Sequence, residues 1–149
     1  MTDAESIANK LIKCFKNGNK LMICGAGGHA SQAAHMAAEF TGKFEHYRQA
    51  LPAIALTTDA SAMTGIGNDW SFDYVFARQI EALGKKGDIL ITLSTSGRSP
   101  SLMLAAYVAE KRGIKHIDFP RQGKITAEVQ EYQLHLIHDV CRKVEKAFL

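Results

Sequence analysis

The chain has 149 residues, of which 46% are hydrophobic and 22% are charged, and its formal net charge is +3 at pH 7. These values are ordinary for one globular domain with a buried core. No apolar run approaches the ~20 residues of a membrane span, and lysines and arginines are scattered, so we expect neither a membrane nor a nucleic acid as a partner. The acidic, polar start is unlike a secretory signal, and three distant cysteines favour a reducing, cytoplasmic setting: Cys14, Cys24 and Cys141.

Apolar periodicity and turn residues predict alternating helices and strands. In chain order we expect a helix that includes residues 7–15 and ends at 17–19, a strand at 21–24, a helix at 31–40, a loop at 44–51 and a strand at 53–56. A short helix at 61–66 with a turn at 67–69, a helix at 72–83 and a strand at 89–93 should follow. The chain should end with a helix at 100–112, a strand at 115–119 and a last helix from about residue 126. Each strand is a continuous apolar run, which is typical of a parallel sheet covered on both faces. The sequence therefore predicts a single α/β domain over residues 1–149, a three-layer sandwich of the doubly wound, flavodoxin-like kind.

Two loops each follow a predicted strand and open a predicted helix. The first reads Gly25-Ala26-Gly27-Gly28-His29, and the second reads Ser94-Thr95-Ser96-Gly97-Arg98-Ser99-Pro100. A helix N-terminus presents free N–H groups and a positive dipole end to an anion. The second loop adds the hydroxyl groups of Ser94, Thr95, Ser96 and Ser99. Two such loops in a small domain indicate a phosphorylated small molecule as the ligand.

The first loop also matches the G-x-G-x-x-A pattern of dinucleotide sites. Such a site needs an acidic residue at the end of the next strand, ~20 residues further on. Glu45 has that spacing, but it lies in a segment that does not resemble a strand. We therefore expect no nucleotide cofactor. The remaining alternative is that the glycines only let the helix pack closely on the sheet.

Polar side chains on two predicted helices are candidates for chemistry. His35 and Glu39 are four residues apart on the helix that leaves the first loop, so they share a face. Gln130 and His138 are eight residues apart on the last helix, broadly on one side. Asp69 follows an apolar segment, where ligand contacts are frequent. His46, His116 and His135 lack such a context, and we interpret them as surface residues.

Several motifs together resemble the sugar isomerase (SIS) domain. They are, in order, Gly25-Ala-Gly-Gly-His, His35-x-x-x-Glu39, Leu51-Pro-Ala-Ile-Ala-Leu, Gly67-Asn-Asp69, Ser94-Thr-Ser-Gly and Gln130-Glu131 followed by His138. Within that family the chain is most similar to the bacterial phosphoheptose isomerases. The resemblance implies interconversion of sedoheptulose 7-phosphate and D-glycero-D-manno-heptose 7-phosphate, a step toward lipopolysaccharide in the cell envelope. It also implies a cytoplasmic homotetramer whose active sites are shared between subunits.

The resemblance also assigns roles to residues. Glu39 and His138 would be the acid–base pair, and His35 and Gln130 would join them around a zinc ion, one per subunit, or around the substrate oxygens alone. The hydroxyls of the second loop would hold the phosphate, and Asp69 would hold a sugar hydroxyl. Gly27, Gly28 and His29 of the first loop would contact the substrate. Apolar residues of the last helix are expected to bury against neighbouring subunits: Val129, Leu136, Val140 and Val144.

The sequence departs from the family pattern in three places. Ala26 and His29 replace an asparagine and a serine of the first loop, and Arg98 stands where asparagine is common. A strand–helix unit after the strand that begins near Lys115 is fused or missing. Two alternatives therefore stay open: isomerisation of another sugar phosphate, and a non-catalytic SIS protein that binds a phosphosugar or the replication initiator. Retention of Glu39 and His138 favours the enzyme.

Overall fold

The computed structural model describes residues 1–149 as a four-stranded sheet with six α-helices and one 3-10 turn. The elements are α1 (Asp3–Lys16), β1 (Leu21–Gly25), α2 (Gly28–Thr41), β2 (Ala53–Ala55), α3 (Ala60–Asp69), η1 (Phe72–Tyr74), α4 (Ala77–Leu83), β3 (Ile89–Leu93), α5 (Pro100–Lys111), β4 (Lys115–Asp118) and α6 (Thr126–Lys146). All strands are parallel, in the order β2-β1-β3-β4. The predicted α/β class with a parallel sheet is confirmed.

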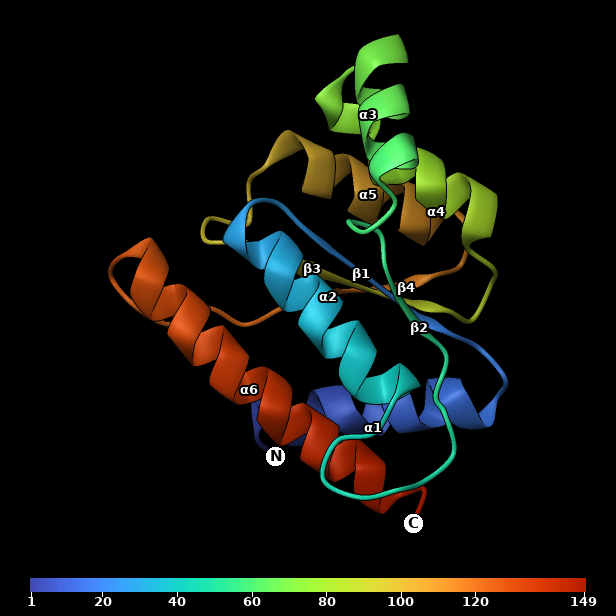
Figure 1. The fold of residues 1–149 in the computed structure, drawn as a ribbon, viewed down its shortest axis with the longest axis vertical. Helices are drawn as coiled ribbons and strands as arrows, with labels where there is room; N and C mark the ends of the chain where they lie inside the picture. The colour runs from blue at the N-terminus through green and yellow to red at the C-terminus, as the bar shows by residue number, and fades with distance from the viewer.

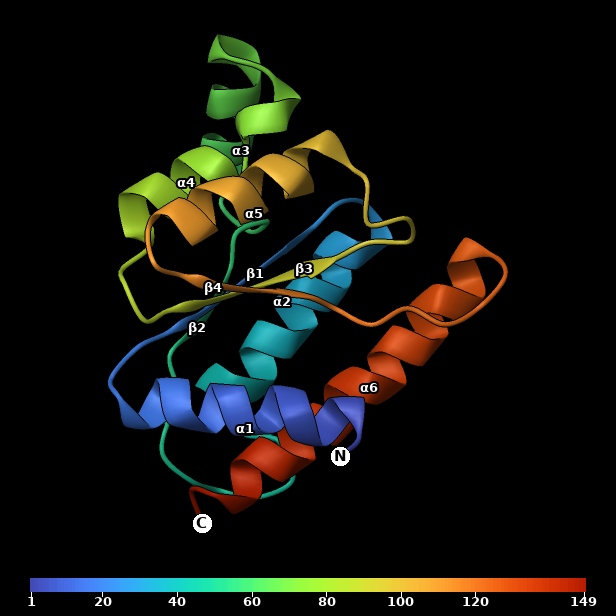
Figure 2. The same cartoon turned by 180° about the vertical axis from the view of Figure 1, so that it is seen from behind.

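Helices cover both faces of the sheet, which gives three layers (Figures 1 and 2). α1, α2 and α6 lie on one face, and α4 and α5 lie on the other. α3 stands out beyond α4 and α5 and has no buried residue. None of the helices combines the length and the apolar character that a membrane crossing requires.

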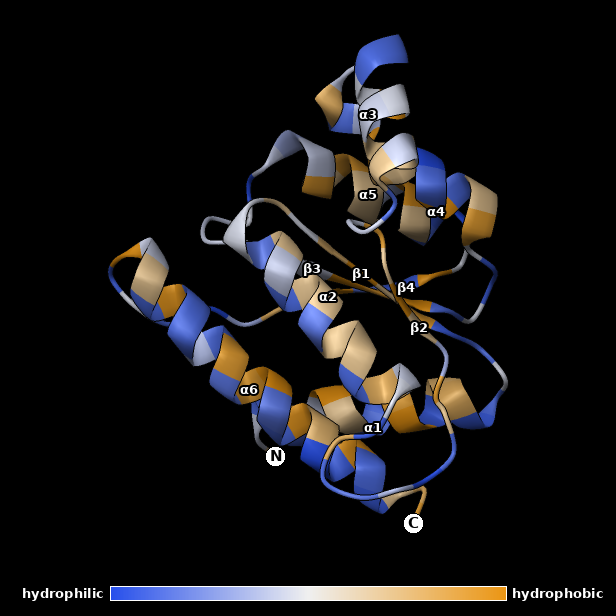
Figure 3. Cartoon of the chain, viewed as in Figure 1, coloured by the Kyte–Doolittle hydropathy of each residue, from blue (hydrophilic) through white to orange (hydrophobic).

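Two apolar cores occupy the two faces of the sheet. Leu21 and Ile91 point into the core shared with α1, α2 and α6. Met22 and Leu90 point into the core shared with α4 and α5. Because neighbouring residues of a strand face opposite sides, a sheet covered on both faces needs fully apolar strands. Figure 3 shows this pattern: the strands are largely hydrophobic, whereas α6 carries hydrophobic and hydrophilic stripes.

The hydrophobic stripe of α6 packs against other elements of the same chain. Val129, Leu136, Val140 and Val144 are at most 7% exposed and are buried without any partner subunit. The last three belong to the core that contains α1 and α2. The expectation that these residues supply spare apolar surface for neighbouring subunits is therefore wrong, because α1 and α2 already cover them.

Local signals explain where several helices begin. Thr2 and Glu5 form a capping box at α1: Glu5 N donates to Thr2 Oγ1 at 3.1 Å, and Thr2 N donates to Glu5 Oε2 at 2.9 Å. Asp59 caps α3 by accepting a hydrogen bond from Ala62 N at 3.0 Å. Pro100 occupies the first turn of α5, where its missing N–H is harmless.

Three predicted boundaries are wrong. α2 begins at Gly28, three residues early, which places His29 in its first turn. α3 continues through the expected turn at 67–69, because Trp70 N still donates to the carbonyl oxygen of Ile66 at 3.0 Å. The helix expected at 72–83 is split into η1 and α4, since the aromatic and β-branched residues at its start have low helix propensity.

Candidate active site

Both predicted ligand loops lie at the carboxyl ends of neighbouring strands, β1 and β3. The chain leaves β1 for α2 on one face of the sheet and leaves β3 for α5 on the other (Figure 1). The topological switch point therefore falls between β1 and β3. Open parallel sheets bind their ligands in the crevice at such a point.

His35, Glu39 and His138 form a cluster between α2 and α6. One ligand-type atom of each residue lies within 4.8 Å of the others. His35 Nε2 is 3.8 Å from Glu39 Oε2, and the ring centroids of His35 and His138 are 5.3 Å apart. His35 is exposed and the other two are half-buried, so a ligand can reach all three. The structure thus brings His138 of α6 next to His35 and Glu39, which are four residues apart on α2.

The loop after α2 forms a wall of this cluster and is anchored by Glu145. The ring centroid of Phe44 lies 5.5 Å from that of His138. The Glu145 carboxylate accepts hydrogen bonds from the amides of Phe44, Glu45 and His46 at 3.1, 2.9 and 3.1 Å. Burial raises the pKa of Glu145, but these hydrogen bonds outweigh burial and hold the pKa below its ordinary value. The ionised carboxylate therefore fixes Phe44 beside His138.

The serine loop, residues 94–99, is shaped by its own hydroxyl groups. Gly97 N donates to Ser94 Oγ at 2.8 Å, and Arg98 N donates to Ser96 Oγ at 3.1 Å. Gly97 has a φ of 73°, which glycine adopts without strain. Ser99 is the N-cap of α5, but its side chain makes no capping hydrogen bond. The loop therefore presents hydroxyl groups at the positive end of α5, with Thr95 exposed beside them.

Gln133 links the two loops, and sequence analysis missed it. Its side chain is fully buried; Oε1 lies 2.9 Å from His29 Nε2, and Nε2 donates to the carbonyl oxygen of Ser94 at 3.2 Å. Burial of His29 lowers the pKa of its imidazole, which stays neutral at pH 7. A signal was present: Gln133 stands between Val129 and Leu136 on the apolar stripe of α6. A polar residue on such a stripe is buried and needs partners.

Gln130 lies over the first loop. A Cβ atom at Gly28 would be only 2.6 Å from Gln130 Nε2, so the lack of a side chain at Gly28 lets Gln130 approach the backbone this closely. Gln32 Nε2 donates to the carbonyl oxygen of Gln130 at 2.7 Å, which ties α2 to α6. The side chain of Gln130 thus sits at the start of α2, against Gly28, the first residue of the helix.

Two expected positions differ in the structure. Asp69 ends α3 on the opposite face of the sheet from α6, and its carboxylate accepts a hydrogen bond from Asn68 Nδ2 at 3.3 Å. Within one chain it does not join the His35 cluster. His116 was expected at the surface, but its Nε2 lies 2.8 Å from Thr92 Oγ1, and burial lowers its pKa. That expectation is wrong, because pairing of β4 with β3 turns the imidazole toward its neighbour strand.

The donor set of the cluster fits a zinc ion. Two imidazoles and one carboxylate are ligand types that zinc prefers, and their atoms are close enough to share one ion. Catalytic zinc sites commonly use three protein ligands and keep another position open. His35, Glu39 and His138 match that requirement. Gln130, expected as a further ligand, lies instead over Gly28 at the start of α2, about two turns of α6 away from His138.

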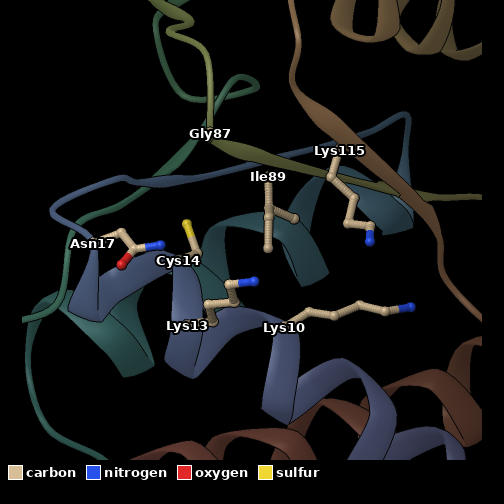
Figure 4. Close-up of a pocket in the computed structure, with 7 residues that line it drawn as sticks. All are labelled: Lys10, Lys13, Cys14, Asn17, Gly87, Ile89 and Lys115. Carbon is tan, nitrogen blue, oxygen red and sulfur yellow. The ribbon is translucent and has the colours of Figure 1, made fainter.

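A separate pocket of about 240 Å³ opens at the other end of the sheet, where β3 and β4 begin (Figure 4). It is lined by Lys10, Lys13, Cys14, Asn17, Gly87, Ile89 and Lys115. The lining includes three lysines and no acidic residue. Because the ligand loops follow the carboxyl ends of the strands, this pocket is not part of the candidate active site.

Comparison with known proteins gives a consistent family. The SIS domain model matches residues 2–119. A phosphoheptose isomerase from Campylobacter concisus is 45% identical over 150 residues, covering 90% of this chain and 79% of that protein. A phosphoheptose isomerase from a Bradyrhizobium species is 42% identical over 165 residues, covering 100% and 83%. An alignment of 165 positions is longer than this chain of 149 residues, so the relative has internal positions that this chain lacks.

Solved structures agree over the whole fold. The structure of phosphoheptose isomerase GmhA from Neisseria gonorrhoeae has a TM-score of 0.89 and 36% identity, covering 96% of this chain and 85% of that chain. A phosphoheptose isomerase from Francisella tularensis has a TM-score of 0.92 and 29% identity, with the same coverage. The four-stranded core and its helices are thus shared with these proteins.

Proposed function

This chain belongs to the SIS domain family, and we propose that it is a phosphoheptose isomerase that interconverts sedoheptulose 7-phosphate and D-glycero-D-manno-heptose 7-phosphate. It is an aldose–ketose isomerase of a phosphorylated heptose, which serves lipopolysaccharide synthesis. The observation that carries the proposal is the cluster of His35, Glu39 and His138. The cluster lies about two helical turns along α2 from Gly28, where the first ligand loop opens the helix.

The reaction moves a proton between C1 and C2 of the sugar through an enediol, which needs a base and an acid. Glu39 and His138 form this pair: one removes the proton from carbon, and the other protonates the carbonyl oxygen. Carboxylates and imidazoles are suited to both roles. His35 orients the sugar oxygens from the same cluster. His35, Glu39 and His138 would hold a zinc ion there, and such an ion would supply Lewis-acid polarisation of a carbonyl oxygen.

The serine loop holds the phosphate, far from the reacting carbons. Binding energy from this remote group orients the carbonyl end of the sugar toward Glu39 and His138. The start of α2, at Gly27 and Gly28, lies beside the sugar chain. His29 replaces the family serine, and its side chain is buried against Gln133. This difference favours a changed contact to the sugar, and keeps isomerisation of another sugar phosphate as the second candidate.

The active protein is a homotetramer in this proposal. Exposed apolar side chains occur on α3, η1 and α5, which pack together: Trp70, Phe72, Tyr74, Met103 and Tyr107. Surfaces of this kind favour subunit contacts. In this proposal Asp69, which directly precedes Trp70, binds a sugar hydroxyl in the site of a neighbouring subunit. A native mass of four chains at micromolar concentration is expected, and a monomer would contradict the shared site.

The protein works in the cytoplasm in this proposal. Its three cysteines are free, and all are buried. Unpaired thiols are typical of a reducing compartment.

Turnover of sedoheptulose 7-phosphate by the purified protein tests the function. We expect the aldose product by chromatography, with fructose 6-phosphate and ribulose 5-phosphate as competing substrates and Glu39→Gln as the inactive control. Turnover of a competing sugar alone would support the second candidate. Binding of sedoheptulose 7-phosphate without product would identify a phosphosugar-binding protein instead.

A further inference from the structure

Arg121 lies directly against the serine loop. A Cβ atom at Gly97 would be 2.7 Å from Arg121 Nη2, 3.0 Å from Cζ and 3.1 Å from Nη1. The guanidinium group therefore occupies the space that a side chain at position 97 would need. Glycine at position 97 thus leaves room for the guanidinium group, and it also adopts the φ of 73° without strain.

Asp118 fixes the orientation of this guanidinium. Arg121 Nη1 donates to Asp118 Oδ1 at 2.7 Å, and Nη2 donates to Oδ2 at 3.0 Å, a two-bond fork that sets the plane of the group. The hydrogen bond to Asp118 raises the pKa of Arg121. The Arg121 side chain is 28% exposed, so it is neither free in solvent nor enclosed.

The two hydrogen bonds to Asp118 leave other N–H donors of Arg121 without a partner. A guanidinium group carries five N–H donors, and two of them are directed at Asp118. The structure gives Arg121 no other hydrogen-bond acceptor. Three oriented N–H groups therefore remain beside a loop of hydroxyl groups at the positive end of α5.

The short connection between β4 and α6 places the arginine there. Asp118 is the last residue of β4, and only residues 119–125 separate it from α6. Because β4 pairs with β3, the end of β4 lies next to the start of the serine loop, and Thr92 is the register partner of Asp118. An arginine three residues beyond β4 can reach this loop within the same chain.

We propose that Arg121 is a phosphate-binding residue, which Asp118 positions so that its free N–H groups complete the serine loop around the phosphate of the substrate. The inference rests on the proposed function, because it assumes that the serine loop holds a phosphate. The N–H groups that do not bind Asp118 lie in the plane of the guanidinium and suit phosphate oxygens, and the positive charge favours a phosphorylated sugar over a neutral one. Arg121 is thus a specificity-determining residue of the reaction.

Inorganic phosphate is the probe, because its binding can be measured without turnover. Phosphate affinity is measured by calorimetry for the full chain, Arg121→Gln, Arg121→Lys and the control Arg112→Gln, which removes an exposed arginine at the far end of α5. Loss of charge-assisted hydrogen bonds should raise the dissociation constant of Arg121→Gln about 10- to 100-fold. Arg121→Lys should be intermediate, since it keeps the charge and loses the fork, and Arg112→Gln should match the parent chain.

A chemical measurement covers the case in which Arg121→Gln does not fold. Phenylglyoxal modifies accessible arginines, and we expect phosphate to slow modification of Arg121 but not of Arg112 in the unmutated protein. If Arg121→Gln binds phosphate as tightly as the parent chain, Arg121 is not a phosphate-binding residue. The same conclusion follows if phosphate binds the unmutated protein but does not protect Arg121 from phenylglyoxal. Either result would leave the serine-loop assignment standing. Absence of phosphate binding by the unmutated protein would overturn the serine-loop assignment as well.

Discussion

Gln133 Oε1 lies 2.9 Å from His29 Nε2, a contact that spans 104 positions of the sequence and joins the first turn of α2 to α6. The amide orientation of Gln133 follows from its other end, because its Nε2 points at the carbonyl oxygens of Ser94 and Pro120 at 3.2 and 3.4 Å. A carboxamide oxygen only accepts, so the neutral imidazole of His29 carries its proton on Nε2. One buried side chain therefore sets both the tautomer of His29 and the position of the serine loop.

Gln133→Ala should destabilise the protein and weaken phosphate binding. The change leaves a buried N–H of His29 and a buried carbonyl of Ser94 without their partner, at about 1–3 kcal/mol for each unsatisfied group. Denaturant unfolding measures this loss. Gln122→Ala, at an exposed glutamine in the loop before α6, is the matched control and should leave the free energy of unfolding unchanged. Equal stability of the two variants would contradict the linking role of Gln133.

Glu39→Gln and His138→Ala should each abolish isomerisation while phosphate still binds. A general acid or base contributes about 10²- to 10⁴-fold to the rate, so the loss should appear in kcat. Product formation from sedoheptulose 7-phosphate measures it. The controls are His135→Ala and Glu131→Gln, which change exposed residues of the same types on α6. Near-normal kcat in either site variant would show that the cluster is not the acid–base pair.

Ser99→Ala should weaken phosphate binding without loss of stability. The Ser99 hydroxyl makes no capping hydrogen bond in α5, so its removal should change the free energy of unfolding little. One charge-assisted hydrogen bond to the phosphate contributes about 1.5–3 kcal/mol. Calorimetry with inorganic phosphate and thermal unfolding separate the two effects, and Ser61→Ala on the exposed α3 is the control. Unchanged phosphate affinity would remove Ser99 from the phosphate site.

Glu145→Gln should remove an acid-sensitive part of the stability. The pKa of Glu145 lies below its ordinary value of 4.5 in the folded protein, so the ionised group stabilises the fold above that value. The contribution is lost as the pH falls through the folded-state pKa. The variant also leaves the buried Arg48, whose Nε is 3.3 Å from Glu145 Oε1, without its anion. We expect a loss of about 3–5 kcal/mol at neutral pH.

Unfolding measured from pH 7 to pH 3 checks this expectation. The difference between Glu145→Gln and the parent chain should narrow on the acid side, because acid protonates the carboxylate in the parent. Glu110→Gln, an exposed glutamate of α5, should run parallel to the parent throughout. A difference independent of pH would mean that Glu145 acts by packing and not by its charge.

Removal of metal should lower turnover if the cluster holds zinc. Elemental analysis of protein purified without chelator should give one zinc per chain, and His35→Ala should lower that content because it removes one of three ligands. His135→Ala, which changes an exposed histidine of α6 outside the cluster, is the control. Full activity in metal-free protein would leave only hydrogen bonding and acid–base chemistry for these residues.

The sequence was sufficient for the elements that a simple pattern determines. The apolar runs of β1 and β3 and the small residues after them locate both ligand loops, because strand, loop and helix signals agree there. The break between η1 and α4 was not predictable from periodicity, because Val75 and Phe76 continue the apolar pattern across it. Only the low helix propensity of the aromatic and β-branched residues there indicates the break.

Site contacts between distant segments were harder to predict. His35 and Glu39 share a helix face, so their proximity follows from spacing alone. The approach of Phe44 to His138 depends on the anchoring of a loop by Glu145, about a hundred positions away. The contact of Arg121 with Gly97 depends likewise on the pairing of β4 with β3. Such contacts need the three-dimensional arrangement.

The packing of α1 on α6 has a consequence for biosynthesis. Ile7 and Leu11 of α1 lie in the same core as Ile137 and Val140 of α6, so the earliest and latest helices cover each other. During translation, α1 leaves the ribosome long before α6 has been synthesised. The apolar face of α1 therefore stays exposed to solvent until the rest of the chain has been made. Contacts of such long sequence separation slow folding. Nascent chains arrested before residue 126 should therefore depend on chaperones, whereas completed chains should not.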